Sequence, residues 1–178
     1  MEKLIKLVSN SHVTVKQDDN GDEVLEIVGY ASTGSKDRHG DIILPEAWKK
    51  GTSEYERNPI ILAYHNHDTP AGKTTGLEIN KKGLKITGQI SKAAGNVYTL
   101  VKEGILSTFS VGFMVKDADY DEKTNIFVIK EAELLEISVV AVPANPDATF
   151  SIAKCFEYAN HIFRTSLIVS QLKPLRDK

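Results

Sequence analysis

The stretch Gly104–Val115, with the sequence GILSTFSVGFMV, predicts a turn followed by one β-strand. Successive side chains of a strand point to opposite faces, so four apolar residues are expected on one face: Phe109, Val111, Phe113 and Val115. Ser110 falls on the other face together with Gly112, which has no side chain. The hydroxyl is therefore expected to have open space above it, and we interpret Ser110 as a candidate nucleophile. The plainer interpretation is an ordinary serine within a strand.

The rest of the chain predicts many short strands and few helices. Strands are expected at 24–32, 42–44, 60–64, 73–79, 84–90, 126–129 and 133–142, and a turn at Thr69–Gly72. Helices are expected after Pro45, over Asn96–Lys102 and in the C-terminal part. The predicted fold class is mostly β with flanking helices (α+β), a small antiparallel β-barrel with helices packed outside. We expect one domain over residues 1–150, followed by a helical segment over residues 151–178.

Composition narrows the classes of function. The chain has 178 residues, of which 41% are hydrophobic and 26% charged, as in ordinary globular domains. A net charge of −2 argues against nucleic acid or an anionic membrane as partner. The single cysteine, Cys155, excludes an intrachain disulfide and a cysteine-based zinc site. Met1–Lys6 lacks the apolar core of a signal peptide, so we expect a reducing, cytosolic compartment or a particle assembled within it.

Glu136 stands in the middle of an otherwise uncharged stretch, Leu134–Val142. An ionised carboxylate is rarely buried without a partner, so Glu136 is expected to reach water, a cation or a hydrogen-bond donor. An imidazole N–H would serve, and that pair is part of a Ser/His/acid triad. The alternative is a carboxylate on the wet face of the strand, paired with a lysine.

Two histidines follow a buried strand in the segment His65–Asp68. His65 and His67 are two residues apart and share a face if the strand continues. They are consistent with one catalytic base and one incidental histidine, with two incidental ones, or with a metal site. The metal alternative draws on the charged loop upstream: Asp37, His39 and Asp41. That loop otherwise reads as an ion-paired surface turn or as the lining of a substrate groove.

Several segments, taken in order, resemble the prohead (capsid maturation) serine protease family of tailed bacteriophages, of the HK97 type. They are DRHGDIILPEAW at 37–48, LAYH at 62–65 with PAG at 70–72, GL at 83–84, LSTFSVGF at 106–113 and LEISVVAVPAN at 135–145. The resemblance covers about residues 24–150. The family is related in fold to the herpesvirus assembly proteases, so the resemblance implies a β-barrel ringed by helices.

The resemblance also implies a function and a set of site residues. It implies a serine endopeptidase with Ser110 as nucleophile, His65 as base and Glu136 as third member, which needs no metal or organic cofactor. It further implies action inside the procapsid, in the host bacterial cytoplasm, on scaffold protein or the scaffolding segment of the major capsid protein, and on itself. Our own candidates for substrate binding are Gly112, Asp37 and Arg38. We expect no nucleic-acid or membrane partner.

Some alternatives stay open at this level. The family commonly has aspartate after the histidine, and this chain has Asn66, so His67 is the alternative base. Ser107 is the rival nucleophile. The chain could also be a non-catalytic module that binds capsid or scaffold, or a metallohydrolase built on His65, His67 and Asp41. A homodimer through residues 152–170, or a higher oligomer within the procapsid, is a further expectation.

Overall fold

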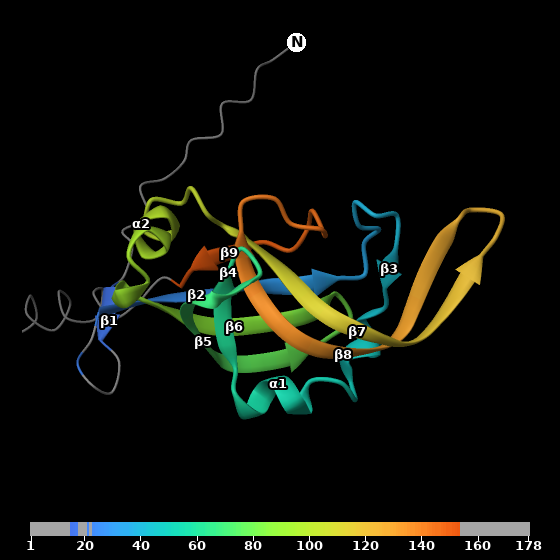
Figure 1. The fold of residues 1–178 in the computed structure, drawn as a ribbon, viewed down its shortest axis with the longest axis horizontal. Coiled ribbons are helices and arrows are strands. Elements are labelled where there is room, and N and C mark those ends of the chain that lie inside the picture. Colours follow the sequence, from blue (N-terminus) through green and yellow to red (C-terminus); the bar gives the residue numbers. More distant parts are fainter. Residues whose placement is uncertain (1–14, 18–20, 22, 154–178) are drawn as a thin grey trace, which may run out of the picture.

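The molecule is built around one mixed β-sheet (Figure 1). The structure is a computed structural model that describes residues 15–17, 21 and 23–153. Its strands are β1 (Val15–Gln17), β2 (Glu23–Thr33), β3 (Ile42–Ile43), β4 (Ile60–Ala63), β5 (Asn66–Ile79), β6 (Gly83–Ser91), β7 (Thr108–Asp121), β8 (Ile126–Val140) and β9 (Phe150–Ile152). The helices are α1 (Ser53–Arg57) and α2 (Asn96–Lys102), with 3₁₀ turns η1 (Pro45–Trp48) and η2 (Lys92–Ala94).

The sheet is mostly antiparallel, but not entirely. Strands follow the order β1-β2-β6-β5-β4-β8-β3, with β7 paired to β8 and β9 paired to β2. β7 lies along the whole of β8, while β3 and β4 pair with different parts of β8 in parallel. The mostly-β class is thus confirmed, and the sheet is mixed, because two of its pairings are parallel. Because β3 and β4 run in the same direction along β8, the chain between them must cross back over, and η1 and α1 lie in that connection.

A barrel ringed by helices is not confirmed. The strand path is that of an open sheet, and among the described residues no ladder pairs β7 with β2; the segment 148–150 lies between them and bonds to both. Phe109 N–H donates to Ala148 O at 2.8 Å, and Phe150 N–H donates to Ser107 O at 2.9 Å. Within the described residues the two α-helices have five and seven residues, and they lie on different sides of the sheet (Figure 1).

The core is made by the inward faces of the strands. Phe109 is fully buried and contacts Phe150 with ring centroids 4.4 Å apart. Trp48 of η1 is fully buried and meets Phe113 edge-on at 5.6 Å. The alternation predicted for β7 is therefore confirmed where that strand crosses the core. Val115, farther along β7, is 48% exposed. The ends of β7 and β8 project away from the body of the molecule (Figure 1).

Local predictions have mixed outcomes. The helix over Asn96–Lys102 is confirmed, and the chain leaves it at Gly104, whose φ of +74° favours glycine. Pro45 opens a 3₁₀ turn. The turn at Thr69–Gly72 is wrong, since β5 runs through it with register shifts opposite Leu62. Residues 150–152 form β9, and the rest of the predicted C-terminal helical segment lies outside the described residues.

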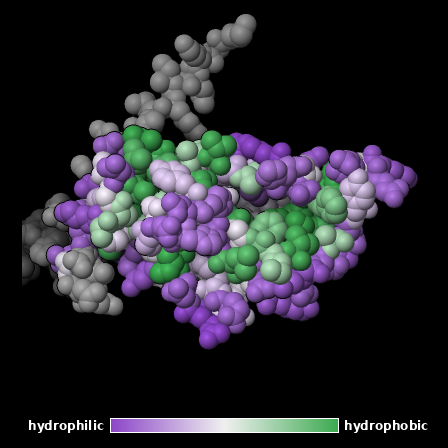
Figure 2. Space-filling model, in the orientation of Figure 1, coloured by the Kyte–Doolittle hydropathy of each residue, from purple (hydrophilic) through white to green (hydrophobic). Residues whose placement is uncertain are grey.

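Apolar surface gathers over β7 and β8 on the face shown in Figure 2. Exposed large apolar side chains of the two strands are Met114, Val115, Phe127 and Leu135. Tyr120 and Phe127 pack together across the projecting hairpin, with centroids 4.7 Å apart. As for membranes, no helix in the part of the chain that the structure describes has the length and apolar character to span one.

Candidate active site

His65 lies in a tight turn between β4 and β5. Ala63 pairs with Asn66, which leaves only Tyr64 and His65 in the loop, and both have φ of +58°. Positive φ at both central residues is the pattern of a type I′ turn, which usually takes asparagine and glycine. A residue other than glycine held at positive φ costs roughly 1–3 kcal/mol of folding free energy, so other contacts must hold the turn. Tyr64 N–H donates to Val139 O at 2.9 Å, and His65 N–H donates to Ser138 Oγ at 3.1 Å.

The Glu136 carboxylate is held by two hydrogen bonds. Its Oε1 is bonded to Nδ1 of His65, and its Oε2 accepts from Ser138 Oγ at 2.6 Å. The Glu136 side chain is only 12% exposed, whereas that of His65 is 44% exposed. Both oxygens are partnered, which is what a mostly buried carboxylate requires. Of the alternatives weighed for Glu136, the imidazole partner is the one in the structure.

Gly112 makes room for this carboxylate. It is the cross-strand partner of Glu136, and a Cβ at position 112 would lie 2.6 Å from Glu136 Oε1. The space above Gly112 is therefore occupied by the Glu136 side chain. The open space was expected above the Ser110 hydroxyl, and Gly112 itself adds nothing to it.

Ser110 lies on the same face of the sheet as Glu136. It pairs with Ser138 across β7 and β8, two positions from the Gly112–Glu136 pair. Leu62 of β4 pairs with Ser138 from the other side, so three adjacent strands contribute to one row. Ser110 is 5% exposed, and its hydroxyl makes no hydrogen bond to any other described residue. The sheet register thus places the candidate nucleophile beside the His65–Glu136 pair without a direct bond to it.

A small cavity adjoins Ser110. Its volume is about 30 Å³, enough for about two water molecules. Ser32 of β2 lines it, and the Ser32 hydroxyl is buried without a partner among the described residues. Other lining residues come from β7 and from the loops around Asp37 and Asn145. The open space beside Ser110 is thus formed by β2 and these loops.

The charged loop is anchored by its own side chains. Asp37 Oδ1 accepts from the backbone N–H groups of His39 and Asp41, at 2.8 and 2.9 Å. Arg38 donates from Nη1 to Pro143 O, and its backbone N–H donates to Ala144 O at 2.9 Å. Asp37 also lines the Ser110 cavity. These contacts fix the loop beside the site, and substrate binding by Asp37 and Arg38 stays a prediction.

The second histidine lies apart from the pair. His67 is exposed in β5, and the contact with Glu136 is made by His65. The metal alternative lacks a ligand set in this part of the chain: across residues 15–17, 21 and 23–153, no three histidine, cysteine, aspartate or glutamate side chains are grouped to hold an ion.

Tyr55 of α1 has a raised pKa to which burial and the charge of Glu136 contribute. Its hydroxyl donates to Ile60 O at 3.2 Å and shares a 2.7 Å hydrogen bond with Thr74. Burial raises the pKa of Tyr55 to about 12, with a smaller contribution from the charge of Glu136. The phenol is therefore neutral at physiological pH and serves to hold α1 to β4 and β5.

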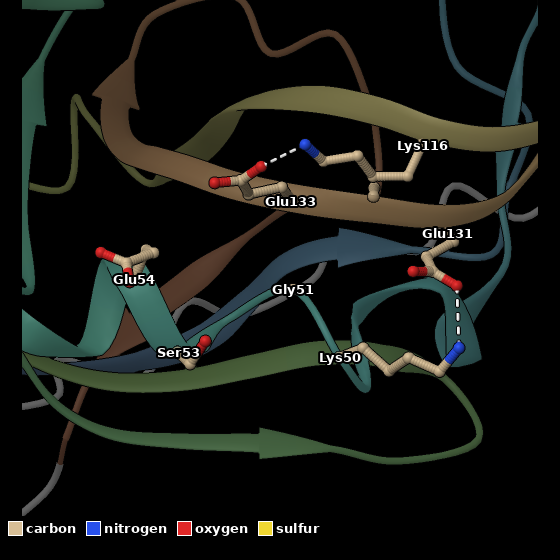
Figure 3. Close-up of a pocket in the computed structure, with 8 residues that line it drawn as sticks. Lys50, Gly51, Ser53, Glu54, Lys116, Glu131 and Glu133 are labelled. Carbon is tan, nitrogen blue, oxygen red and sulfur yellow. Dashed lines mark hydrogen bonds and ion pairs between the residues drawn. The ribbon is translucent and has the colours of Figure 1, made fainter.

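A separate pocket of about 200 Å³ lies between α1 and β8 (Figure 3). Its charges are paired: Lys50 with Glu131 at 3.0 Å, and Lys116 with Glu133 at 2.5 Å. Gly51 lines it, and a Cβ there would collide with Ala132 O at 1.8 Å. None of the residues predicted from the sequence as site residues lines this pocket, so its size does not mark it as the site.

Ser138 was not among the residues predicted from the sequence. It is fully buried and bonds to both His65 and Glu136. Its spacing could have identified it, because Ser138 follows Glu136 by two residues and residues two apart in a strand share a face.

Comparison with known proteins gives consistent matches. A family model described as caudovirus prohead serine protease matches residues 11–162. The chain is 47% identical over 134 residues to the prohead protease of Escherichia phage T5, covering 74% of this chain and 64% of that protein. It is 32% identical over 162 residues to the prohead protease of Enterobacteria phage HK97, covering 86% and 71%. The chain therefore spans just under two thirds of the T5 protein.

Among solved structures, the fold is similar to a crystal structure of the KSHV protease in complex with a hexapeptide phosphonate inhibitor. The TM-score is 0.48 at 15% sequence identity, covering 84% of this chain and 78% of that chain.

Proposed function

The chain belongs to the caudovirus prohead serine protease family, and on that premise we propose that it is an endopeptidase with a Ser110–His65–Glu136 triad. Its proposed substrates are scaffold protein or the scaffolding segment of the major capsid protein, and the chain itself. The proposed place of action is the procapsid interior, consistent with relatives that are named prohead proteases. The observation that carries the triad is the hydrogen bond between His65 Nδ1 and Glu136.

This hydrogen bond determines which imidazole nitrogen is available for catalysis. An ionised carboxylate can only accept, so Nδ1 of His65 carries the ring hydrogen and donates this hydrogen bond to Glu136. In the neutral ring, Nε2 is then the basic nitrogen. That is the tautomer a general base needs, and Glu136 also stabilises the imidazolium that forms.

The proposed reaction follows from these roles. Ser110 Oγ attacks the carbonyl carbon of the scissile peptide while Nε2 of His65 takes the hydroxyl proton. The tetrahedral intermediate collapses, the C–N bond breaks, and His65 returns the proton to the leaving amine. Water then attacks the acyl-enzyme while losing a proton to His65. The ester C–O bond breaks, His65 returns that proton to Ser110 Oγ, and the carboxylic acid product leaves. Backbone N–H groups of a loop are the expected donors to the oxyanion.

One observation favours a second candidate, a non-catalytic module that binds capsid or scaffold. The Ser110 hydroxyl makes no hydrogen bond to His65 or to any other described residue. In substrate-free enzymes such bonds are often long and shorten only in the complex, so the missing bond does not refute the triad. Cleavage itself must distinguish them.

The experiment incubates the purified chain with the major capsid protein of the same phage and identifies fragments by mass spectrometry. We expect discrete fragments from the wild type and none from Ser110→Ala, with an unchanged circular dichroism spectrum. Ser107→Ala is the matched control, because Ser107 is the rival nucleophile and only its backbone carbonyl is engaged, by Phe150. Wild-type cleavage by Ser110→Ala would refute the triad, and binding without cleavage by the wild type would support the module.

A further inference from the structure

Ser138 lies where the contacts of His65 and Glu136 meet. It is in β8, is fully buried, and pairs with Ser110 on one side and Leu62 on the other. It therefore occupies the middle of the row that leads from β4 to the candidate nucleophile.

The Ser138 hydroxyl both donates and accepts a hydrogen bond. Its single proton goes to Glu136 Oε2 at 2.6 Å, since a carboxylate cannot donate, and its oxygen accepts from His65 N–H at 3.1 Å. A hydroxyl that is enclosed and bonded in this way is poorly placed to attack a substrate. Ser138 is thus distinguished from Ser110, which lines a cavity and whose hydroxyl bonds to no other described residue.

These two bonds act on two different parts of the same pair. The bond to Oε2 fixes the rotation of the Glu136 carboxylate, so that Oε1 faces the imidazole. The bond from His65 N–H holds the backbone of a turn in which Tyr64 and His65 both have positive φ. Such a turn persists only when its surroundings hold it. One side chain therefore sets the position of the base and the orientation of its acid.

We propose that Ser138 is a positioning residue that holds His65 and Glu136 in catalytic geometry. The proposal rests on the proposed triad. It predicts that removing the hydroxyl lowers the rate of the chemical step rather than the binding of substrate, because neither bond of Ser138 involves a group that contacts substrate.

The test compares Ser138→Ala and Ser138→Thr with the wild type in a continuous peptide-cleavage assay. The peptide is taken from the cleavage site found in the capsid protein. The matched control is Thr52→Val, which removes another buried hydroxyl that donates to a carboxylate at 2.6 Å, that of Glu56 in α1. We expect Ser138→Ala to lose kcat by roughly 10- to 100-fold with KM within about twofold, because about 1 Å of misplacement can cost 100-fold.

A second readout follows the hydrogen bond directly. The Nδ1 proton of His65 should give a downfield proton NMR resonance, assigned by its loss in His65→Asn. We expect Ser138→Ala to shift or broaden it, Thr52→Val to leave it unchanged, and Ser138→Thr to recover both this signal and much of kcat.

The outcomes separate this inference from the proposed function. If Ser110→Ala is inactive and Ser138→Ala has the kcat and resonance of Thr52→Val, Ser138 is only structural and the inference fails alone. If Ser110→Ala cleaves like the wild type, the triad fails and the positioning role fails with it. A Ser138→Ala variant that loses activity only through a raised KM would also overturn the inference.

Discussion

The Glu136 carboxylate covers Gly112, its cross-strand partner, so closely that a Cβ at position 112 would stand 2.6 Å from Oε1 and 2.9 Å from Cγ. The glycine therefore decides where the carboxylate can lie. Because Oε1 is the atom bonded to His65, a change at Gly112 acts on the proposed base without touching it.

Gly112→Ala should reduce both activity and stability. The added methyl group pushes on a mostly buried carboxylate held by two hydrogen bonds, so we expect the free energy of unfolding to fall by about 1–3 kcal/mol as those bonds are lost. Displacing Glu136 from His65 should lower kcat by roughly 10- to 100-fold in the peptide assay. Gly76→Ala is the control in β5, where a Cβ would stand 3.7 Å from Thr87. Full activity of Gly112→Ala would show that the Glu136 position does not matter.

The two histidines should respond differently to substitution. His65→Asn removes the ring bonded to Glu136 and should lower kcat/KM by at least about 100-fold, the lower end of what a general base contributes. His67→Asn changes an exposed residue of β5 and should leave kcat/KM within about twofold. The measurement is initial rates of peptide cleavage at pH 7. Loss of activity in His67→Asn with retention in His65→Asn would reverse the assignment of the base.

Truncating Phe109 of β7 should lower the free energy of unfolding more than truncating Phe127 of β8. It is fully buried against Phe150, so Phe109→Ala should lower the free energy of unfolding by about 3–5 kcal/mol. Phe127→Ala is the control, since Phe127 is 47% exposed and packs on Tyr120 of the projecting hairpin; about 1 kcal/mol is expected there. Urea unfolding followed by circular dichroism measures both. Equal losses would mean that the hairpin end is part of the cooperative core.

Stability toward acid should depend on Glu23 of β2. Hydrogen bonds from Lys92 and then Tyr98 lower the pKa of Glu23 from 4.5 to about 2. A carboxyl group whose pKa is lower in the folded state stabilises the protein above pH 4.5 and loses that contribution as the pH falls toward 2. The urea midpoint of Glu23→Gln should therefore fall less than that of the wild type between pH 5 and pH 3.

Glu122→Gln provides the control for this comparison, because Glu122 is an exposed carboxylate at the turn between β7 and β8. Its urea midpoint should follow the wild type across the same range. If the urea midpoint of Glu23→Gln fell as much as that of the wild type, the Lys92 and Tyr98 contacts would not be formed in solution.

Much of the site was predictable because a strand can be recognised from a short stretch of sequence, and its side chains alternate between two faces. The faces of Phe109 and Ser110 follow from the period of two, and an isolated carboxylate in an apolar strand required a partner. The turn at Tyr64–His65 was not predictable, since neither residue is typical of positive φ and only the pairing of β4 with both β5 and β8 holds it there. The parallel pairings of β3 and β4 with β8 were not predicted either, because they join strands that lie far apart in the sequence.

The sequence by itself determined the class of fold, the family, and the three side chains proposed to act together: Ser110, His65 and Glu136. Only the tertiary structure decided that Glu136 fills the space above Gly112, that His65 rather than His67 meets it, and that Ser138 joins the two. The physical reason is that these contacts depend on strand register. A shift of one residue between β7 and β8 would turn the same side chains to opposite faces, and register is set by the packing of the whole sheet.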